Sequence, residues 1–365
     1  MKLVFVIPTL GSGGAERVLS SLTNDWVERK NCEIEIITLM KGEDFYSINN
    51  AVKIHRLSYS SNGVFKIFNM ISLFWKLRKL IKVLKPDVTI SFIRASNIFT
   101  LLSIAGLKMK LVISERDSPD THLSTVYKFL RKKLYPYSDG IIVQTKEYEK
   151  FILKEVGHIN CKVIPNPVRN ISNKNIEREK IIISVGRLIP VKGHAYLIEA
   201  FSKCKNKNNW KLIILGDGVL KNDLIKRTKD LGVENQVEFM GATPKVDYWL
   251  CKSSIFAFTS LSEGFPNALA EGMSASLPCV SFNCKTGPED LIKDNFSGYL
   301  VKVGDVENFS LKLENLMADS TLRSYLGENA KEVSNTLKFS EISDKYYNFI
   351  LEVMHADPKK CKLIN

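Results

Sequence analysis

The chain has 365 residues, of which 45% are hydrophobic and 25% are charged. This length favours two domains of ordinary size, and the balanced composition excludes a largely disordered chain. The net charge is +13 and lies mainly in residues 1–170, which hold 26 Lys and Arg against 15 Asp and Glu. A basic half indicates a polyanionic partner, either a nucleic acid or an anionic membrane surface, although lysines that only keep a protein soluble give the same count.

The seven cysteines are scattered and include no C-x-x-C pair. This argues against a zinc site or a disulfide framework and favours a reducing, cytoplasmic compartment. The apolar run MKLVFVIP leads into a glycine turn rather than a cleavage site, so we expect a first β-strand and not a signal peptide. No apolar run approaches the roughly 20 residues that a membrane-spanning helix needs. We therefore expect a protein that is soluble or lies on a membrane surface.

Short apolar runs alternate with helix-length segments along the chain, as in parallel strands joined by helices. In the first half, helical patterns cover residues 15–29 and 64–84. The expected strands of this half cover residues 3–7, 34–39, 52–56, 88–91, 111–114 and 140–143. Those of the second half cover residues 181–185, 211–215, 236–239, 255–259 and 278–281. The sequence thus predicts an α/β protein of two doubly wound domains, with ligands in a cleft at the carboxyl ends of the strands.

Pro165 and Pro167, followed by a polar, asparagine-rich stretch, mark the domain boundary. We expect a first domain over residues 1–168, a linker over 169–180 and a second domain over 181–338.

A glycine turn, Gly11-Ser12-Gly13-Gly14, separates the first strand from the first helix. Glycines at such a turn let a ligand approach the backbone. Glu16 stands where a dinucleotide-binding G-x-G-x-x-G motif has its third glycine, and no G-K-[ST] of a P-loop follows. Either the turn is tight for steric reasons alone, or the N–H groups of Gly13 and Gly14 face a phosphate or another substrate oxygen.

Two cations follow the first strand of the second half. Gly186 and Arg187 end this strand, and Lys192 precedes the next helix. Cations at such a place form a diphosphate site without a metal, although two solvated surface charges give the same pattern. The next strand ends in Asp217 and Gly218, a weaker signal of the same kind.

The stretch SEGFPNALAEG, residues 262–272, is the sharpest signal. Pro266 suits the first turn of a helix. Main-chain N–H groups at the start of this helix would face a ligand, where the helix dipole favours negative charge. These N–H donors lie at Gly264, Phe265 and Asn267, on either side of Pro266, which itself has no N–H. The Glu271 carboxylate can accept both hydroxyls of a ribose, and Glu263 can hold hydroxyls of a second sugar.

The G-G-A-E-R turn, the G-R…K-G pair and the E-G-F-P-x-x-x-x-E element resemble family 4 glycosyltransferases of the GT-B fold. The resemblance runs from Met1 to about His355. It implies two Rossmann-like domains facing across a cleft, a nucleotide-sugar donor, retention of the anomeric configuration and no metal or other cofactor. The absence of D-x-D from the chain agrees with metal independence. The resemblance also implies that the first domain binds the acceptor, the second binds the donor, and residues 339–356 form a helix that packs back on the first domain.

The same resemblance assigns roles to individual residues. Arg187 and Lys192 would bind and neutralise the departing diphosphate, Glu271 would bind the ribose and Glu263 the donor sugar. The main chain of residues 264–266 would wrap sugar and phosphate. Further donor contacts are implied at Gly13, Gly14, Gly186, Asp217, Gly218 and Asn267.

After the strand at residues 111–114, many relatives carry a histidine that touches the donor sugar. This chain has Glu115-Arg116-Asp117 there, and these three residues are candidates for sugar or acceptor contacts. The S-E-R form looks like enzymes that build lipid-linked oligosaccharides for O-antigen, capsule or glycoproteins.

Residues 64–85 form a basic amphipathic segment without an acidic residue. Positions 67, 70, 71, 74, 77, 81 and 84 recur at helical spacing and are expected to face the core. The acid-free polar face favours docking on an anionic membrane. The expected docking cations are Lys66, Lys76, Arg78, Lys79, Lys82, Arg131, Lys132 and Lys133. No zinc finger, RNA-recognition aromatic signature or helix-turn-helix pattern supports nucleic acid as the partner.

The sequence therefore predicts a retaining glycosyltransferase, peripheral on the inner face of the cytoplasmic membrane. By resemblance, it moves an N-acetylhexosamine from a UDP-linked donor to a polyprenyl-diphosphate-linked glycan. Its expected partners are the donor, this acceptor and the anionic membrane. Two other interpretations use the same donor site: a UDP-sugar epimerase, and a membrane-bound sensor of sugar nucleotides that has no turnover.

Overall fold

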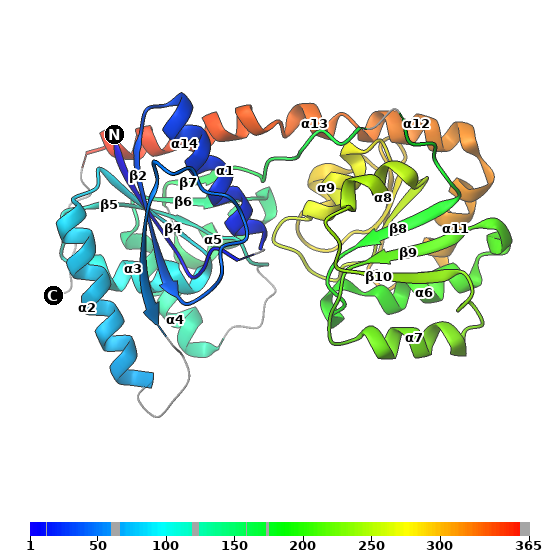
Figure 1. Ribbon diagram of the computed structural model, residues 1–365, viewed down its shortest axis with the longest axis horizontal. Helices are drawn as coiled ribbons and strands as arrows, with labels where there is room; N and C mark the ends of the chain where they lie inside the picture. The colour runs from blue at the N-terminus through cyan, green and yellow to red at the C-terminus, as the bar shows by residue number, and fades with distance from the viewer. Residues whose placement is uncertain (12, 60–65, 119–123, 158, 173–174, 358–365) are drawn as a thin grey trace. The chain divides into compact units, whose positions relative to one another are not determined.

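The computed structural model describes residues 1–357 except 12, 60–65, 119–123, 158 and 173–174. The chain divides into two compact units, both visible in Figure 1. Unit 1 comprises Met1–Asn166 and the segment that begins at Ser340. Unit 2 comprises Pro167–Phe339.

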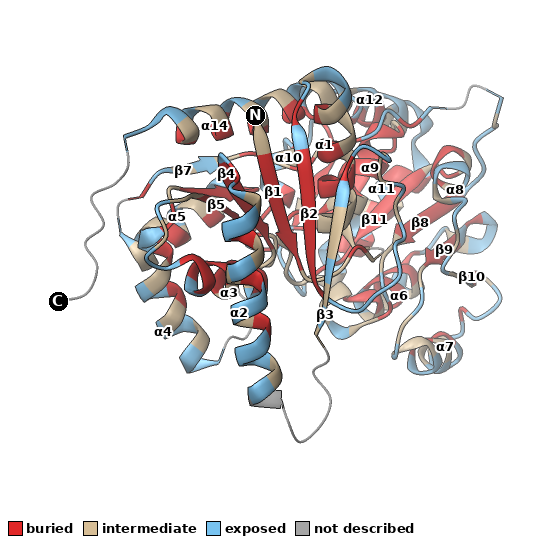
Figure 2. Cartoon of the chain, turned by 60° about the vertical axis from the view of Figure 1, so that its left-hand side comes forward, coloured by how far each residue is buried: buried red, intermediate tan, exposed pale blue. Residues whose placement is uncertain are grey.

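Unit 1 is built on a parallel sheet in the order β3-β2-β1-β4-β5-β6-β7. Isoleucine and valine dominate its central strands, and helices cover both faces, so β1 and β4 are almost wholly buried (Figure 2). The strands are β1 (Lys2–Ile7), β2 (Glu33–Met40), β3 (Lys53–Tyr59), β4 (Val88–Phe92), β5 (Lys110–Ser114), β6 (Gly140–Val143) and β7 (Cys161–Val163). The helices are α1 (Gly14–Arg29), α2 (Lys66–Leu84), α3 (Arg94–Ile104), α4 (Thr125–Leu134) and α5 (Lys146–Val156).

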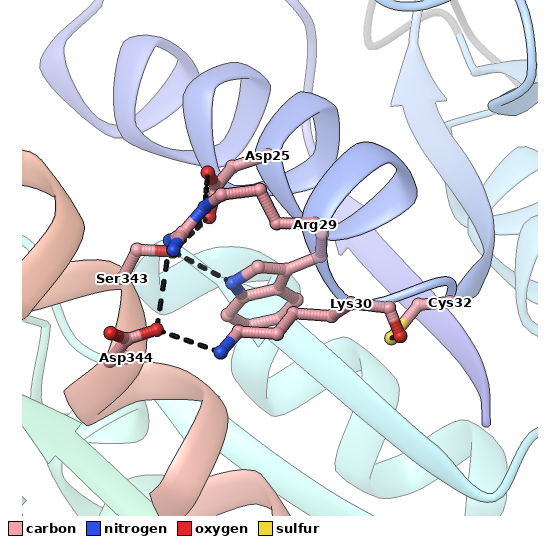
Figure 3. A network of polar contacts seen from close by, with 7 residues as sticks. Asp25, Arg29, Lys30, Cys32, Ser343 and Asp344 are labelled. Carbon is pink, nitrogen blue, oxygen red and sulfur yellow. Dashed lines mark hydrogen bonds and ion pairs between the residues drawn. The ribbon is translucent and has the colours of Figure 1, made fainter.

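Helix α14 (Phe339–His355) returns the chain to unit 1 and docks on α1 through the polar network in Figure 3. The indole N–H of the fully buried Trp26 donates to Ser343 Oγ at 2.9 Å, and Ser343 Oγ donates to Asp25 at 2.6 Å. At the rim of this contact, Lys30 Nζ lies 3.0 Å from the Asp344 carboxylate. The buried apolar side of α14 and these hydrogen bonds together fix the helix to unit 1.

Unit 2 repeats the doubly wound plan with a parallel sheet in the order β10-β9-β8-β11-β12-β13. Its strands are β8 (Ile181–Val185), β9 (Lys211–Leu215), β10 (Val237–Gly241), β11 (Ile255–Phe258), β12 (Cys279–Phe282) and β13 (Tyr299–Val301). Its helices are α6 (His194–Lys203), α7 (Lys221–Asp230), α8 (Val246–Lys252), α9 (Asn267–Ser274), α10 (Pro288–Leu291), α11 (Val306–Ala318), α12 (Ser320–Ala330) and α13 (Val333–Thr336). The predicted class, two doubly wound α/β domains, is confirmed.

Helix α2 departs from the sequence-based expectation. Its core side carries Leu73, Leu77 and Ile81, which are buried, but Met70 and Ile71 are exposed although their spacing predicted core positions. The expectation was wrong because the apolar residues of α2 cover more than one side of the helix. No helix among the described residues combines the length and the apolar composition needed to cross a bilayer.

Candidate active site

The loops that follow β8 and β9 in unit 2 are packed main chain against main chain. The Gly186 N–H donates to Leu215 O and the Leu188 N–H donates to Asp217 O, both at 2.9 Å. Gly216 has φ +138°, and a Cβ there would strike the Gly186 carbonyl oxygen. A Cβ on Gly218 would lie 2.5 Å from Leu188 O. The glycines of the G-D-G stretch are therefore required by loop packing, while Asp217 is exposed at the surface.

The loop after β8 is also tied to the loop after β11. The Leu261 N–H donates to Val191 O at 2.8 Å, and Thr259 Oγ1 donates to Lys192 O at 3.2 Å. Gly193 has φ +63° and lies so close to Thr259 O that a Cβ would collide with it. These contacts hold Lys192 in place at the carboxyl edge of the sheet.

Lys192 and Glu263 form the polar centre of this edge. Lys192 Nζ lies 2.5 Å from Glu263 Oε1, and Ser260 Oγ donates to the same oxygen at 2.5 Å. Both side chains are mostly buried, with exposures of 21% and 11%. Arg187 stands in the same loop as Lys192 and is exposed. Two of the predicted catalytic residues, Lys192 and Glu263, are thus in direct contact. The third, Arg187, lies with Lys192 in the loop after β8.

Helix α9 carries the second predicted carboxylate. Pro266 caps the helix, and the loop after β12 packs on it so closely that Gly287, with φ +99°, leaves no room for a Cβ. Glu271 is 8% exposed, and its Oε1 lies 3.7 Å from Nη2 of Arg169. Gly272 packs on the Phe256 ring, where a Cβ would lie 2.5 Å from a ring carbon. This glycine seats α9 on β11.

The start of α9 differs in part from the expectation of open N–H donors. The Asn267 N–H donates to Phe265 O at 2.9 Å, so this N–H is occupied within the chain. The Phe265 side chain is buried in unit 2. At the start of α6, burial and the neighbouring Lys192 lower the pKa of His194 to about 4, so His194 is neutral at neutral pH.

In unit 1, the close neighbour of Gly13 is the chain's own Glu16. A Cβ on residue 13 would coincide with the Glu16 carboxylate, which folds back over the first residues of α1. Burial raises the pKa of Glu16, while hydrogen bonds from its own N–H and from Thr9 oppose the shift. The carboxylate places negative charge at the helix start, where we expected Gly13 and Gly14 to meet a phosphate.

The Glu115-Arg116-Asp117 stretch is largely occupied by internal contacts. Glu115 is fully buried, accepts hydrogen bonds from the hydroxyls of Tyr135 and Tyr148, and has its pKa raised by burial. With no exposed surface, the Glu115 side chain cannot reach a sugar or an acceptor in this arrangement, contrary to the sequence-based expectation.

The Arg116 guanidinium donates to Ser114 at 3.0 Å, to Asn166, and to the hydroxyl of Tyr346 at 2.7 Å. The guanidinium therefore has several internal partners, and the sugar or acceptor contact expected of Arg116 stays a prediction. Asp117 is half-buried and pairs with Arg94 at 3.2 Å.

Two of the expected membrane-docking cations are also engaged within unit 1. Arg131 is 2% exposed and pairs with Glu155, so it cannot reach a membrane surface. Arg78 donates to the carbonyls of Ser103 and Ala105 at the end of α3. The side chain of Lys66 lies outside the described residues. The other expected cations, Lys76, Lys79, Lys82, Lys132 and Lys133, are exposed.

Arg169, which the sequence analysis did not single out, is the main addition to the site. The sequence gave no reason to select Arg169, because its contact with Glu271 joins residues that are far apart in the chain. Among the described residues, no three His, Cys, Asp or Glu side chains gather as a metal site requires.

Comparison with known proteins gives matches to both units. Residues 12–169 match the family model Glycosyltransferase Family 4, and residues 168–333 match the model Glycosyl transferases group 1. A Campylobacter jejuni enzyme is 33% identical over 98% of this chain and 100% of its own length. It is named a GalNAc-alpha-(1->4)-GalNAc-alpha-(1->3)-diNAcBac-PP-undecaprenol alpha-1,4-N-acetyl-D-galactosaminyltransferase.

A second Campylobacter jejuni protein is 33% identical over 90% of this chain and 94% of its own length. It is named an N-acetylgalactosamine-N,N'-diacetylbacillosaminyl-diphospho-undecaprenol 4-alpha-N-acetylgalactosaminyltransferase.

Solved structures of GT-B enzymes share the fold. The Anabaena protein HepE, in complex with UDP, gives a TM-score of 0.79 at 17% identity, over 96% of this chain and 100% of that chain. Sucrose-phosphate synthase from Thermosynechococcus elongatus gives a TM-score of 0.82 at 14% identity, over 98% of this chain and 100% of that chain. With both family models and a full-length relative in agreement, the chain belongs to the family 4 (group 1) glycosyltransferases and is a glycosyltransferase of the GT-B fold.

Proposed function

We propose that this glycosyltransferase transfers an N-acetylhexosamine, with retention, from a UDP-linked donor to a polyprenyl-diphosphate-linked glycan. The names of the two Campylobacter relatives support the sugar and the acceptor, because both describe N-acetylgalactosaminyltransferases whose acceptors are linked through diphosphate to undecaprenol. In this proposal unit 2 binds the donor and unit 1 binds the acceptor.

The contact between Lys192 and Glu263 carries the proposal for the donor site. Lys192 pairs with Glu263, so in this proposal a bound diphosphate competes with this carboxylate for the ammonium group. Glu263 is then available to accept hydroxyl hydrogen bonds from the donor sugar. Arg187, exposed in the same loop, supplies the second cation. A guanidinium and an ammonium held at one edge of the sheet are suited to the charge that develops on a departing diphosphate.

In the reaction, the bond from the anomeric carbon to the diphosphate oxygen breaks and the acceptor hydroxyl oxygen bonds to the same face of that carbon. The acceptor proton passes to the departing phosphate oxygen, so no separate general base is required. Lys192 and Arg187 stabilise the diphosphate as its charge grows. Glu271 holds the ribose and Glu263 the sugar.

Exposed apolar and basic side chains on α2 and α4 of unit 1 support docking on an anionic membrane. Phe68, Ile71 and Trp75 lie at helical spacing on α2 and are 71%, 52% and 60% exposed, beside the exposed Lys79 and Lys82. Helix α2 packs on α3 and α3 packs on α4, whose Val126 and Phe129 are also exposed. Figure 2 shows the exposed sides of α2 and α4. Aromatic side chains among lysines suit a lipid surface. In this proposal the surface is the inner face of the cytoplasmic membrane.

The proposal is tested with the full chain, UDP-GalNAc or UDP-GlcNAc, and a synthetic polyprenyl-diphosphate-linked N-acetylhexosamine. We expect a new α-linked disaccharide, identified by NMR. We expect Lys192→Met to lower kcat by about 10²–10³. Lys211→Met is the matched control. Lys211 Nζ lies 2.7 Å from Glu238 Oε1, and Lys211 is at the start of β9, so this ion pair is not at the carboxyl edge of the sheet.

Other outcomes would replace the proposal. Epimerised UDP-sugar formed without an acceptor would indicate an epimerase. Donor binding without any turnover, unchanged in Glu271→Ala, would indicate a sensor. Transfer with inversion would refute the retaining mechanism.

A further inference from the structure

The first segment of unit 2 is fastened to the last residue of α9. Ser274 Oγ donates to Arg169 O at 2.5 Å and accepts from the Ile171 N–H at 3.3 Å. Ser274 is fully buried. The residue before Arg169 is held as well, because the Val168 N–H donates to Leu337 O at 2.9 Å. The main chain at Arg169 is thus held on both sides and has a fixed position against α9.

The Arg169 side chain lies between two carboxylates. Its two terminal nitrogens donate to the carboxylate of Asp247 on α8, at 3.1 and 2.9 Å. Nη2 also lies 3.7 Å from Oε1 of Glu271. Glu271 and Ser274 are three residues apart on α9 and therefore share one side of the helix. Arg169 contacts that side with its main chain at Ser274 and with its side chain at Glu271.

We propose that Arg169 is a positioning residue for the ribose-binding carboxylate of Glu271, an inference that rests on the proposed function of this site. Asp247 fixes the planar guanidinium, and the guanidinium in turn restricts the orientation of the Glu271 carboxylate. A carboxylate that accepts two ribose hydroxyls must be correctly turned before the donor arrives. Arg169 supplies a fixed contact that holds the Glu271 carboxylate in one orientation.

Nucleotide affinity with and without ribose hydroxyls tests this role. Isothermal titration compares UDP and GDP with their 2′,3′-dideoxy analogues on the wild-type chain, Arg169→Met and Arg169→Lys. We expect Arg169→Met to weaken binding of the preferred diphosphate about tenfold, as loss of charge-assisted hydrogen bonds does. Affinity for the dideoxy analogue should fall less than about twofold in Arg169→Met, because this analogue lacks the hydroxyls that Glu271 holds. Arg169→Lys keeps the positive charge but not the planar guanidinium, so its loss of affinity for the diphosphate should lie between these two values.

Two further variants separate this role from general damage. Asp247→Asn should give a smaller loss in the same direction, because it loosens the guanidinium but keeps Arg169. Arg227→Met removes an ion pair with Glu199 between α7 and α6 and should leave nucleotide affinity unchanged. Thermal unfolding without ligand reports whether each variant is folded.

Three results would overturn the inference. Unchanged affinity in Arg169→Met would show that Glu271 needs no positioning by this residue. Equal losses for the diphosphate and its dideoxy analogue would show that Arg169 acts elsewhere on the nucleotide. A wild-type chain that binds neither UDP nor GDP would refute the proposed donor site together with this role.

Discussion

The Glu16 carboxylate occupies the space that any side chain on residue 13 would need, and Gly13 is therefore fitted to a neighbour three residues away. Among the described residues, the close approach that the glycine turn permits is made by the chain itself. An acceptor at the start of α1 satisfies N–H groups that the helix leaves without internal partners, and its charge suits the helix dipole.

Gly13→Ala should therefore destabilise the protein by about 0.5–1.5 kcal/mol, because the flexible Glu16 side chain can turn aside but gives up its hydrogen bonds. Adding Glu16→Ala removes the obstruction, so the double variant should recover most of the cost that Gly13→Ala adds. Urea unfolding of the four chains of this cycle measures the coupling. Gly11→Ala is the control from the same turn, because a Cβ there meets only Thr9 Oγ1 at 3.7 Å. Additive effects of the two substitutions would contradict the explanation.

Gly193→Ala should impair donor binding as well as stability. Residue 193 has φ +63° and lies against Thr259 O, so a methyl group must displace the segment that carries Lys192. Gly304 has φ +84° with nothing within 4 Å of its Cβ position, so Gly304→Ala carries the left-handed strain of about 1–2 kcal/mol without a collision. A thermal-shift titration with UDP should show weaker binding for Gly193→Ala alone. Equal binding by both variants would exclude the collision as the cause.

The buried Glu115 makes stability depend on pH. Burial raises its pKa in the folded state, so the folded protein keeps this proton to a higher pH than the unfolded chain, which loses it near pH 4.3. The stabilisation that the protonated Glu115 contributes is therefore complete below the unfolded-state pKa and is lost as pH rises through the folded-state pKa. Glu115→Gln should gain stability relative to wild type as pH rises above about 4.3, as measured by urea unfolding.

Glu35 is the comparison of opposite sign. Burial raises its pKa, but the hydrogen bonds from Lys2 and His55 outweigh burial and the pKa is lowered overall. Glu35→Gln should therefore lose stability relative to wild type as pH rises over the acid range. A change of the same sign in both variants would contradict these assignments.

Membrane binding should depend on the exposed apolar and basic residues of α2. Trp75→Ser and Phe68→Ser should reduce sedimentation with phosphatidylglycerol vesicles, and Lys79→Glu/Lys82→Glu should reduce it most at low salt. Val219→Ser is the matched control, because Val219 is an exposed apolar residue of unit 2. We expect no binding to phosphatidylcholine vesicles. Unchanged sedimentation of all α2 variants would exclude this face as the docking surface.

The sequence predicted the central strands and the start of helix α9, because both leave local patterns. Apolar runs mark β1 and β8, and E-G-F-P marks the start of α9. The short strands β7 and β13 were not predicted, since three residues at a sheet edge form no clear apolar run. The buried position of Arg131 and the contact between Arg169 and Glu271 depend on residues that are distant in the chain. Such contacts leave no mark in spacing or composition.

The tight packing among the loops of unit 2 bears on how donor choice can be altered by engineering. Gly193, Gly216, Gly218 and Gly287 each abut another part of the chain where a side chain would collide. In a mutational library that covers these loops, most substitutions at the four glycines would give misfolded variants. Diversity is better directed to an exposed neighbour such as Asp217, whose side chain can change without moving the backbone.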